Sequence, residues 1–251
     1  SHTAYYGNRL NFIYTAGSEN NRSVIENNLI NIVSQGYVSA SYNAVIHLSG
    51  YTDVISNTLN RIGQTWGGSE NMALLGSNGA ENIISGNTFF DSQNDRTVYF
   101  SNSHNSVFTN NVIHSAHHNE KTTPVIQVLN SEVLISHNLI ESEGRGVEVN
   151  SQSGGEIINN TIVSPNSADY GIHISNLSAP VVQNNIVEGF TNGIYAENGQ
   201  QNQFIQNNNF WDISEDIFSG TAMPALVGEM IDLNINGDTC DIYSNLNMNP
   251  L

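Results

Sequence analysis

Residues 181–199 read VVQNNIVEGFTNGIYAENG, and this stretch holds the two phrases that recur along the chain. The first phrase is an apolar pair, one or two polar residues, an asparagine and an apolar finish. Its eight copies begin at Val24, Val54, Ile83, Val107, Leu134, Glu156, Val181 and Phe204. Aligned on one position, they give a column with asparagine in seven of eight places: Asn28, Thr58, Asn87, Asn111, Asn138, Asn160, Asn185 and Asn208. A period of roughly 25 residues indicates a stacked repeat architecture.

The second phrase falls between successive copies of the first and alternates with a period of two. It reads AVIHLSG from Ala44, MALLGS from Met72, TVYFSNS from Thr97, VIQVLNS from Val125, GVEVNSQ from Gly146, GIHISNL from Gly171 and GIYAENG from Gly193. Each unit therefore predicts two short strands separated by Gly, Asn and Ser turns. Because so small a unit cannot bury both strand faces alone, we expect equivalent strands to stack in parallel. The inward column is predicted to be Ile25, Ile55, Ile84, Phe108, Ile135, Ile157, Val182 and Ile205.

Stacked asparagines can bond to one another and to turn backbone, because an amide carries donors and an acceptor. With this column, and with repeats of the form N-N-x-I followed by G-I-x-x, the chain resembles the pectin-lyase-like right-handed parallel β-helices from Val24 to Phe210. The L-x-x-L-x-L signature of leucine-rich repeats, which have a similar period, does not occur.

This resemblance implies an all-β chain with one domain over residues 1–251, a right-handed parallel β-helix of about eight coils. The repeats occupy about residues 20–210, and residues 211–251 are expected to form an irregular closing segment. We expect its apolar side chains to cover the open end of the core: Trp211, Ile217, Phe218 and Met230.

The composition bears on partners and on location. Acidic residues number 23 against 6 basic ones, which gives a net charge of −17 and makes nucleic acid an improbable partner. No apolar run is long enough for membrane insertion. A single cysteine, Cys240, excludes an intrachain disulfide, and we expect a secreted or cell-surface protein of bacterial origin. Because the chain starts at Ser1 and the tail NMNPL resembles a motif that follows such helices, we expect a piece of a longer polypeptide.

One residue in each second strand lies between two inward neighbours and is predicted to face solvent. These residues form an outward ladder of His47, Leu74, Tyr99, Gln127, Glu148, His173 and Tyr195. Gly146, Gly171 and Gly193 stand two positions before its last three members, so we expect a shallow groove beside them.

The resemblance also suggests a site. In the polysaccharide lyases of this superfamily a lysine or arginine removes the proton α to a uronate carboxyl group, while calcium offsets the carboxylate charge. On that pattern the candidate catalytic residues are Lys121, Arg145, Glu148 and His173. The candidate substrate-binding residues are Tyr99, Arg96, Asp169 and Tyr195, and the candidate Ca²⁺ ligands are Glu120 and Glu143.

Other interpretations of the same residues stay open. No active-site string of a lyase family matches residue by residue, and Glu148 with Asp169 on adjacent coils would also suit a glycoside hydrolase. Solvated turn charges would explain these residues without any activity. A transition-metal site could also form from histidines of two consecutive coils, although no carboxylate or cysteine completes a known ligand spacing. The candidate ligands are His104, His114, His117, His118 and His137.

Two functions follow from these observations. The first is binding or processing of an extracellular polysaccharide along the solvent-exposed strand face. The second is a structural or adhesive surface or filament module without catalytic activity, whose partner is another surface protein. The fold serves both purposes, so the site must decide between them.

Overall fold

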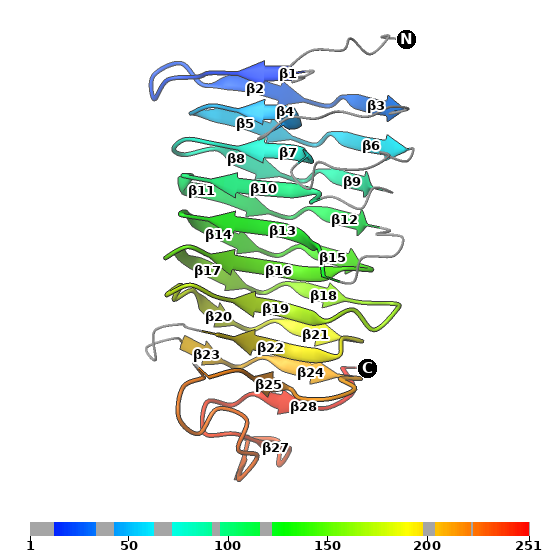
Figure 1. Cartoon of the computed structure of the whole chain (residues 1–251), viewed down its shortest axis with the longest axis vertical. Coiled ribbons are helices and arrows are strands. Elements are labelled where there is room, and N and C mark those ends of the chain that lie inside the picture. The colour runs from blue at the N-terminus through cyan, green and yellow to red at the C-terminus, as the bar shows by residue number, and fades with distance from the viewer. Residues whose placement is uncertain are drawn as a thin grey trace.

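A computed structural model describes residues 13–33, 43–62, 72–91, 96–115, 122–197, 204–221 and 223–250. Their regular structure is entirely β-strand, which confirms the all-β class. The strands stack along one axis, from β1 (Ile13–Thr15) near the N-terminal end to β28 (Leu246–Asn247) near the C-terminal end (Figure 1). The described ranges contain no helix with the length and apolarity of a membrane span.

The strands lie in three sheets. Sheet 1 contains, in spatial order, β1, β4 (Asn43–Leu48), β7 (Met72–Ser77), β10 (Val98–Ser101), β13 (Pro124–Leu129), β16 (Arg145–Asn150), β19 (Tyr170–Ile174), β22 (Asn192–Ala196) and β25 (Phe218–Ser219). Sheet 2 contains β2 (Ser23–Glu26), β5 (Thr52–Ile55), β8 (Ile83–Ser85), β11 (His104–Thr109), β14 (Glu132–Ser136), β17 (Gly154–Ile158), β20 (Val181–Gln183) and β23 (Phe204–Gln206). Sheet 3 runs from β3 (Leu29–Val33) through β6 (Thr58–Ile62), β9 (Thr88–Asp91), β12 (Val112–Ser115), β15 (Leu139–Ser142), β18 (Thr161–Val163), β21 (Ile186–Glu188), β24 (Asn209–Trp211) and β28 to β27 (Thr239–Cys240) and β26 (Asp232–Leu233).

Each turn of the solenoid has three strands, not the two that the phrases predict. The apolar phrase is divided by a corner of two residues, so its first half lies in sheet 2 and its second half in sheet 3. Six turns, from β4–β6 to β19–β21, have a parallel partner on both sides in every sheet, slightly fewer than the coils expected. The remaining turns form the ends of the stack.

The asparagine column is a continuous hydrogen-bonded ladder at the corner between sheets 2 and 3. In each rung the backbone N–H and the side-chain Nδ2 of one asparagine both donate to Oδ1 of the asparagine one coil later, at 2.9–3.1 Å. Nδ2 also donates to a backbone carbonyl of the preceding coil; Asn138 donates to Phe108 at 3.0 Å. The amide is thereby paired in the interior, where an unpaired polar group would be costly.

The residue before each ladder asparagine has a positive φ, between 55° and 66° for the rungs from Asn57 to Asn208. This left-handed conformation turns the chain sharply between two strands, and asparagine and glycine adopt it at low cost. Asn110, Asn159, Asn184 and Gly86 occupy such positions. The doublet N-N in the repeat is therefore a left-handed turn residue followed by a ladder residue.

The predicted register is wrong by one residue in the second coil. Asn57 is the rung that joins Asn28 to Asn87, and Thr58 already belongs to β6. The inward residue of that coil is correspondingly Val54, which pairs with Ile84, instead of Ile55. Since side chains alternate across a strand, a slip of one residue exchanges the buried and the exposed set. The predicted inward residues from Ile84 to Ile205 pair with one another in register, and Ile25 pairs with Val54.

The closing segment extends the ladder before ending it. Asn245 forms one more rung after Asn208, and β28 pairs in parallel with β24. Asp241 then accepts hydrogen bonds from the backbone N–H and the Nδ2 of Asn245, both at 2.9 Å, and is buried. A carboxylate only accepts, so it terminates a chain of donors that all point the same way.

The core is covered at this end by apolar side chains of the closing segment, although not by all those predicted. Ile217 and Phe218 pack against the core as expected, together with Ile213, Met223 and Val227. Trp211 stands beside Glu188 on the outer face of sheet 3, and Met230 is not part of the cover.

A second ladder, which the sequence did not reveal, follows the corner between sheets 1 and 2. The backbone N–H of Ser103, Ser131 and Ser153 each donate to the serine hydroxyl one coil later, at 2.9–3.1 Å, with Ser178 as the last acceptor. These serines are buried. Two corners of the coil are thus held by side chains that repeat with the coil.

Replacing Asn138 by leucine is expected to lower the free energy of unfolding by about 1–3 kcal/mol, because the donors of Asn111 lose their acceptor inside the protein. Chemical denaturation measures this difference. Asn166→Leu, at an exposed asparagine, is the control and should be nearly neutral. Equal stability of the two variants would contradict a stabilising ladder.

Replacing Asp241 by asparagine is expected to cost about 2 kcal/mol of unfolding free energy, since a neutral amide accepts less strongly than a carboxylate and places a donor against Asn245. Glu215→Gln removes the same charge from an exposed position in the closing segment and should leave stability unchanged. If both variants unfold at the same denaturant concentration, Asp241 does not terminate the ladder.

Candidate functional site

The outward ladder of sheet 1 exists, with one correction. Tyr14, His47, Gly76, Tyr99, Gln127, Glu148, His173, Tyr195 and Ser219 are consecutive partners across the strands. Leu74, predicted as the member from the third coil, is fully buried in the core, and Gly76 takes its place. Leu74 and Leu75 are consecutive and both are buried in the core. The prediction assumed that inward and outward residues alternate strictly along the strand, and it therefore chose the wrong outward residue.

Glu148 is the centre of a polar cluster on this face. Gln127 Nε2 donates to its Oε1 at 2.6 Å, and Arg145 Nη1 donates to its Oε2 at 3.2 Å. His173 Nδ1 lies 3.3 Å from the same Oε2. Arg145 also reaches Asp169, with Nη2 3.9 Å from Oδ2, while its Nε is buried without a hydrogen-bond partner. One guanidinium therefore bridges two carboxylates from adjacent coils.

A third carboxylate and two tyrosines complete the group. Glu197 Oε1 lies 3.3 Å from Nε2 of His173, and its Oε2 accepts from the hydroxyl of Tyr195 at 3.3 Å. Tyr170 stacks on Tyr195 with ring centroids 4.7 Å apart, and the guanidinium carbon of Arg145 lies 4.9 Å from the Tyr170 ring centroid. We name this group the Arg145 cluster: Gln127, Arg145, Glu148, Asp169, Tyr170, His173, Tyr195 and Glu197.

The environment of Glu148 fixes its ionisation. Burial raises the pKa, but hydrogen bonds from His173 and Gln127 and the charges of His173 and Arg145 outweigh it, and the pKa falls from 4.5 to about 2. Such a carboxyl group is ionised near neutral pH and has no proton to give to a leaving group. A general acid needs the opposite shift, so Glu148 is suited to hold Arg145 and His173 in place.

The glycines beside the ladder do not form an outward groove, contrary to the prediction. A Cβ at Gly171 would lie 2.3 Å from Val187, and one at Gly193 would lie 2.7 Å from Phe210. A Cβ at Gly146 would lie 2.6 Å from Ile162. All three positions face the interior, where glycine makes room for the core side chains of sheet 3.

Of the predicted site residues, Arg145, Glu148, Asp169, His173 and Tyr195 come together in the Arg145 cluster. Arg96 and Tyr99 form a separate pair on the same sheet, with the guanidinium carbon 5.1 Å from the ring centroid.

Of the two predicted metal ligands the structure describes Glu143, which is not a member of the Arg145 cluster. Glu143 accepts a hydrogen bond from Asn166 at an exposed turn, and Lys121 and Glu120 lie outside the described residues. Among the residues that the structure describes, no three His, Cys, Asp or Glu side chains are grouped as metal ligands.

The predicted histidine site is likewise dispersed where it is described. His114 pairs with Glu141, at 2.7 Å, and stacks on Phe90 on the outer face of sheet 3. His137 lies 3.3 Å from the amide of Asn159 at the ladder corner, and His117 and His118 lie outside the described residues.

Sequence reasoning missed two members of the cluster, Tyr170 and Glu197, and left Gln127 without a role. Glu197 had a usable signal, since it follows Tyr195 by two residues and so shares its face. Tyr170 begins its strand, where alternation has not yet set in, and nothing in the repeat marks it. Gln127 was placed on the outward ladder, but its hydrogen bond to Glu148 became apparent only from the structure.

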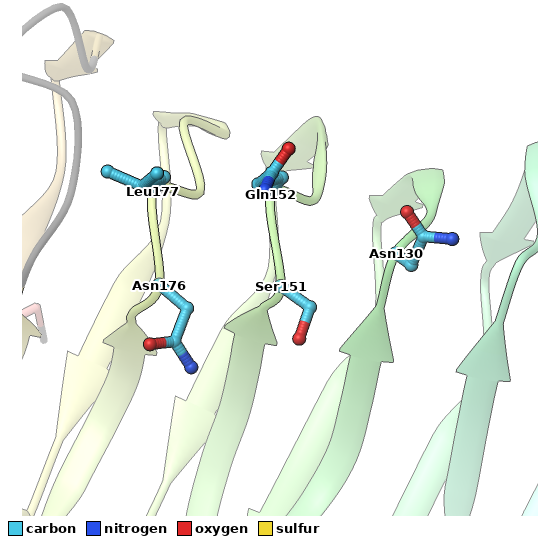
Figure 2. Close-up of a pocket in the computed structure, with 5 residues that line it drawn as sticks. All are labelled: Asn130, Ser151, Gln152, Asn176 and Leu177. Carbon is cyan, nitrogen blue, oxygen red and sulfur yellow. The ribbon is translucent and has the colours of Figure 1, made fainter.

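Two hollows lie apart from the Arg145 cluster. A shallow depression of about 450 Å³ is lined by Asn130, Ser151, Gln152, Asn176 and Leu177, which follow one another along the turns after β13, β16 and β19 (Figure 2). Its lining has no charged side chain, so it offers no carboxylate, imidazole or amine for acid–base chemistry. A smaller hollow of about 20 Å³ lies over Gly76, between His47 and Tyr99.

The fold and the site together define a class: a parallel β-helix with a polar and aromatic cluster on the outer face of one sheet. The family model described as right handed beta helix region matches residues 118–223, which span the strands of the Arg145 cluster. The protein is thus a right-handed parallel β-helix, and the pectin-lyase-like resemblance is consistent with it. Neither the search of curated proteins nor that of solved structures finds a match.

The lowered pKa of Glu148 predicts a pH-dependent contribution to stability. A depressed folded pKa stabilises the protein above the unfolded value of 4.5, and this contribution is lost as the pH falls toward 2. Between these values the wild type should lose on the order of 3 kcal/mol more unfolding free energy than Glu148→Gln. Denaturation at a series of pH values measures the difference.

Glu156→Gln is the matched control, because Glu156 is an exposed glutamate on the outer face of sheet 2. It should follow the pH profile of the wild type. If the Glu148 variant does so as well, the Arg145 cluster does not hold this carboxylate ionised.

Proposed function

We propose that the protein binds an extracellular polysaccharide on the outer face of sheet 1, at the Arg145 cluster. The observation that carries this proposal is the stacked pair of Tyr170 and Tyr195 beside the carboxylates of Asp169 and Glu197. Aromatic rings offer an apolar face to the C–H groups of a sugar, while neighbouring polar atoms bond to its hydroxyls. The side chains are already fixed by contacts with one another, so binding costs little ordering.

Binding is favoured over cleavage. The predicted proton transfer needs a group that exchanges its proton near neutral pH, whereas Glu148 is held ionised and Arg145 is engaged by two carboxylates. A lyase reaction through Lys121, with calcium at Glu120 and Glu143, stays a prediction that depends on residues outside the described ranges. A secreted or cell-surface location and a bacterial origin also stay predictions.

A structural or adhesive role is the alternative, and one observation favours it. On the outer face of sheet 2 one column of eight paired residues is apolar except at Asp53 and Glu156. Its members Val24, Ile83 and Phe204 are 55%, 37% and 64% exposed. Exposed apolar stripes of this kind commonly contact other proteins.

Tyr195→Ala is expected to weaken polysaccharide binding about threefold to tenfold, because the ring contributes its stacking face and positions Glu197. Affinity electrophoresis or calorimetry against a glycan panel measures the change. Phe204→Ala, at an exposed aromatic residue of sheet 2, is the control and should bind as the wild type does. Equal loss in both variants, or none in either, would contradict a site at the Arg145 cluster.

A further inference from the structure

The charges of the Arg145 cluster bear on the kind of sugar that it accepts. The cluster has one arginine against three carboxylates, those of Glu148, Asp169 and Glu197. Two of the carboxylates are the more accessible charges: the side chains of Glu197 and Asp169 are 40% and 32% exposed, while that of Arg145 is 19% exposed. An approaching ligand therefore meets negative charge before it meets the guanidinium.

The guanidinium is also engaged already. Arg145 directs Nη1 to Glu148 and Nη2 toward Asp169, and its guanidinium carbon lies over the ring of Tyr170. A sugar carboxylate would have to displace one of these partners to form the two parallel bonds that make arginine a strong anion ligand. The net charge of −17 opposes the same approach over longer distances.

The uncharged parts of a sugar, by contrast, find suitable partners. Glu197 uses two hydrogen-bonding positions, toward His173 and from Tyr195, and a carboxylate has about four, so two remain for sugar hydroxyls. The partner of Tyr195 in the next strand is Ser219, whose small side chain is turned to Asn192. The side of the Tyr195 ring toward β25 thus faces a small residue rather than another bulky one.

We infer that the polysaccharide bound at the Arg145 cluster is uncharged, with hydroxyl groups that donate to Glu197 and Asp169 and a sugar ring that stacks on Tyr195. This inference rests on the proposed function, since it specifies the ligand of the same site. It differs from the acidic uronate that the resemblance suggested, because the described charges of the face repel such a polymer. Each unit charge at roughly 6 Å in water changes an affinity about threefold.

The test uses the full chain and pairs of polymers that differ only in charge. Pectate and alginate are each compared with the same polymer after chemical reduction of its carboxyl groups to primary alcohols, alongside neutral glucans, mannans, xylans and galactans. Binding is measured by calorimetry with calcium and with a chelator, at low and at moderate salt. We expect at least one neutral or reduced polymer to bind at least threefold more tightly than any acidic one, with little dependence on salt.

Glu197→Gln sharpens the test, because it removes one exposed charge and keeps a hydrogen-bonding group. It should lower the preference for the neutral polymer about threefold, while Glu156→Gln on sheet 2 should leave it unchanged. Preferential binding of an acidic polymer, with or without calcium, would overturn the inference and leave the proposed function standing. Binding of no polymer in either class would overturn the proposed function, and the inference with it.

Discussion

The rest of the structure depends on one repeated interaction, the pair of hydrogen bonds that joins each ladder asparagine to the next. Both donors end on the same Oδ1, so every rung sets the same offset between coils. Strand pairing alone tolerates slippage along a flat sheet, but a buried amide has partners at only one register. The ladder asparagine and its left-handed neighbour form a two-residue corner in every turn from β2–β3 to β23–β24, whatever the length of the rest of the coil.

The Arg145 cluster is a consequence of that constancy. Its members come from β13, β16, β19 and β22 and from the residues that adjoin them, and they are separated by up to some 70 residues in sequence. Neighbouring strands lie about 4.8 Å apart, so side chains at equivalent positions are within hydrogen-bonding reach only if the coils stay in register. Glu148 receives contacts from the coil before and the coil after its own. A catalytic or binding surface on this scaffold is therefore assembled across coils, not within one.

The repeat predicted the architecture because burial, turn chemistry and hydrogen bonding all recur with the same period. For the same reason it placed four cluster residues on one face: Gln127, Glu148, His173 and Tyr195. The errors arose where one signal stood alone. In VISNTLN a single asparagine gave no doublet to align, so Thr58 was chosen over Asn57, and in MALLGS the doublet Leu74–Leu75 hid the outward Gly76. The pKa of Glu148 and the pairing of Arg145 depend on neighbours a full coil away, which no local pattern encodes.

The two-residue corner also separates what can change in this molecule from what cannot. Repeat lengths differ from coil to coil, and the differences fall outside this corner. The path from sheet 3 back to sheet 1, for example, is longer between β3 and β4 than between β15 and β16. Insertions and deletions there leave the amide contacts untouched. A whole coil is consequently the unit that gene duplication can add to lengthen the rod. The connecting segments outside the corner can change in length and sequence without disturbing the fold.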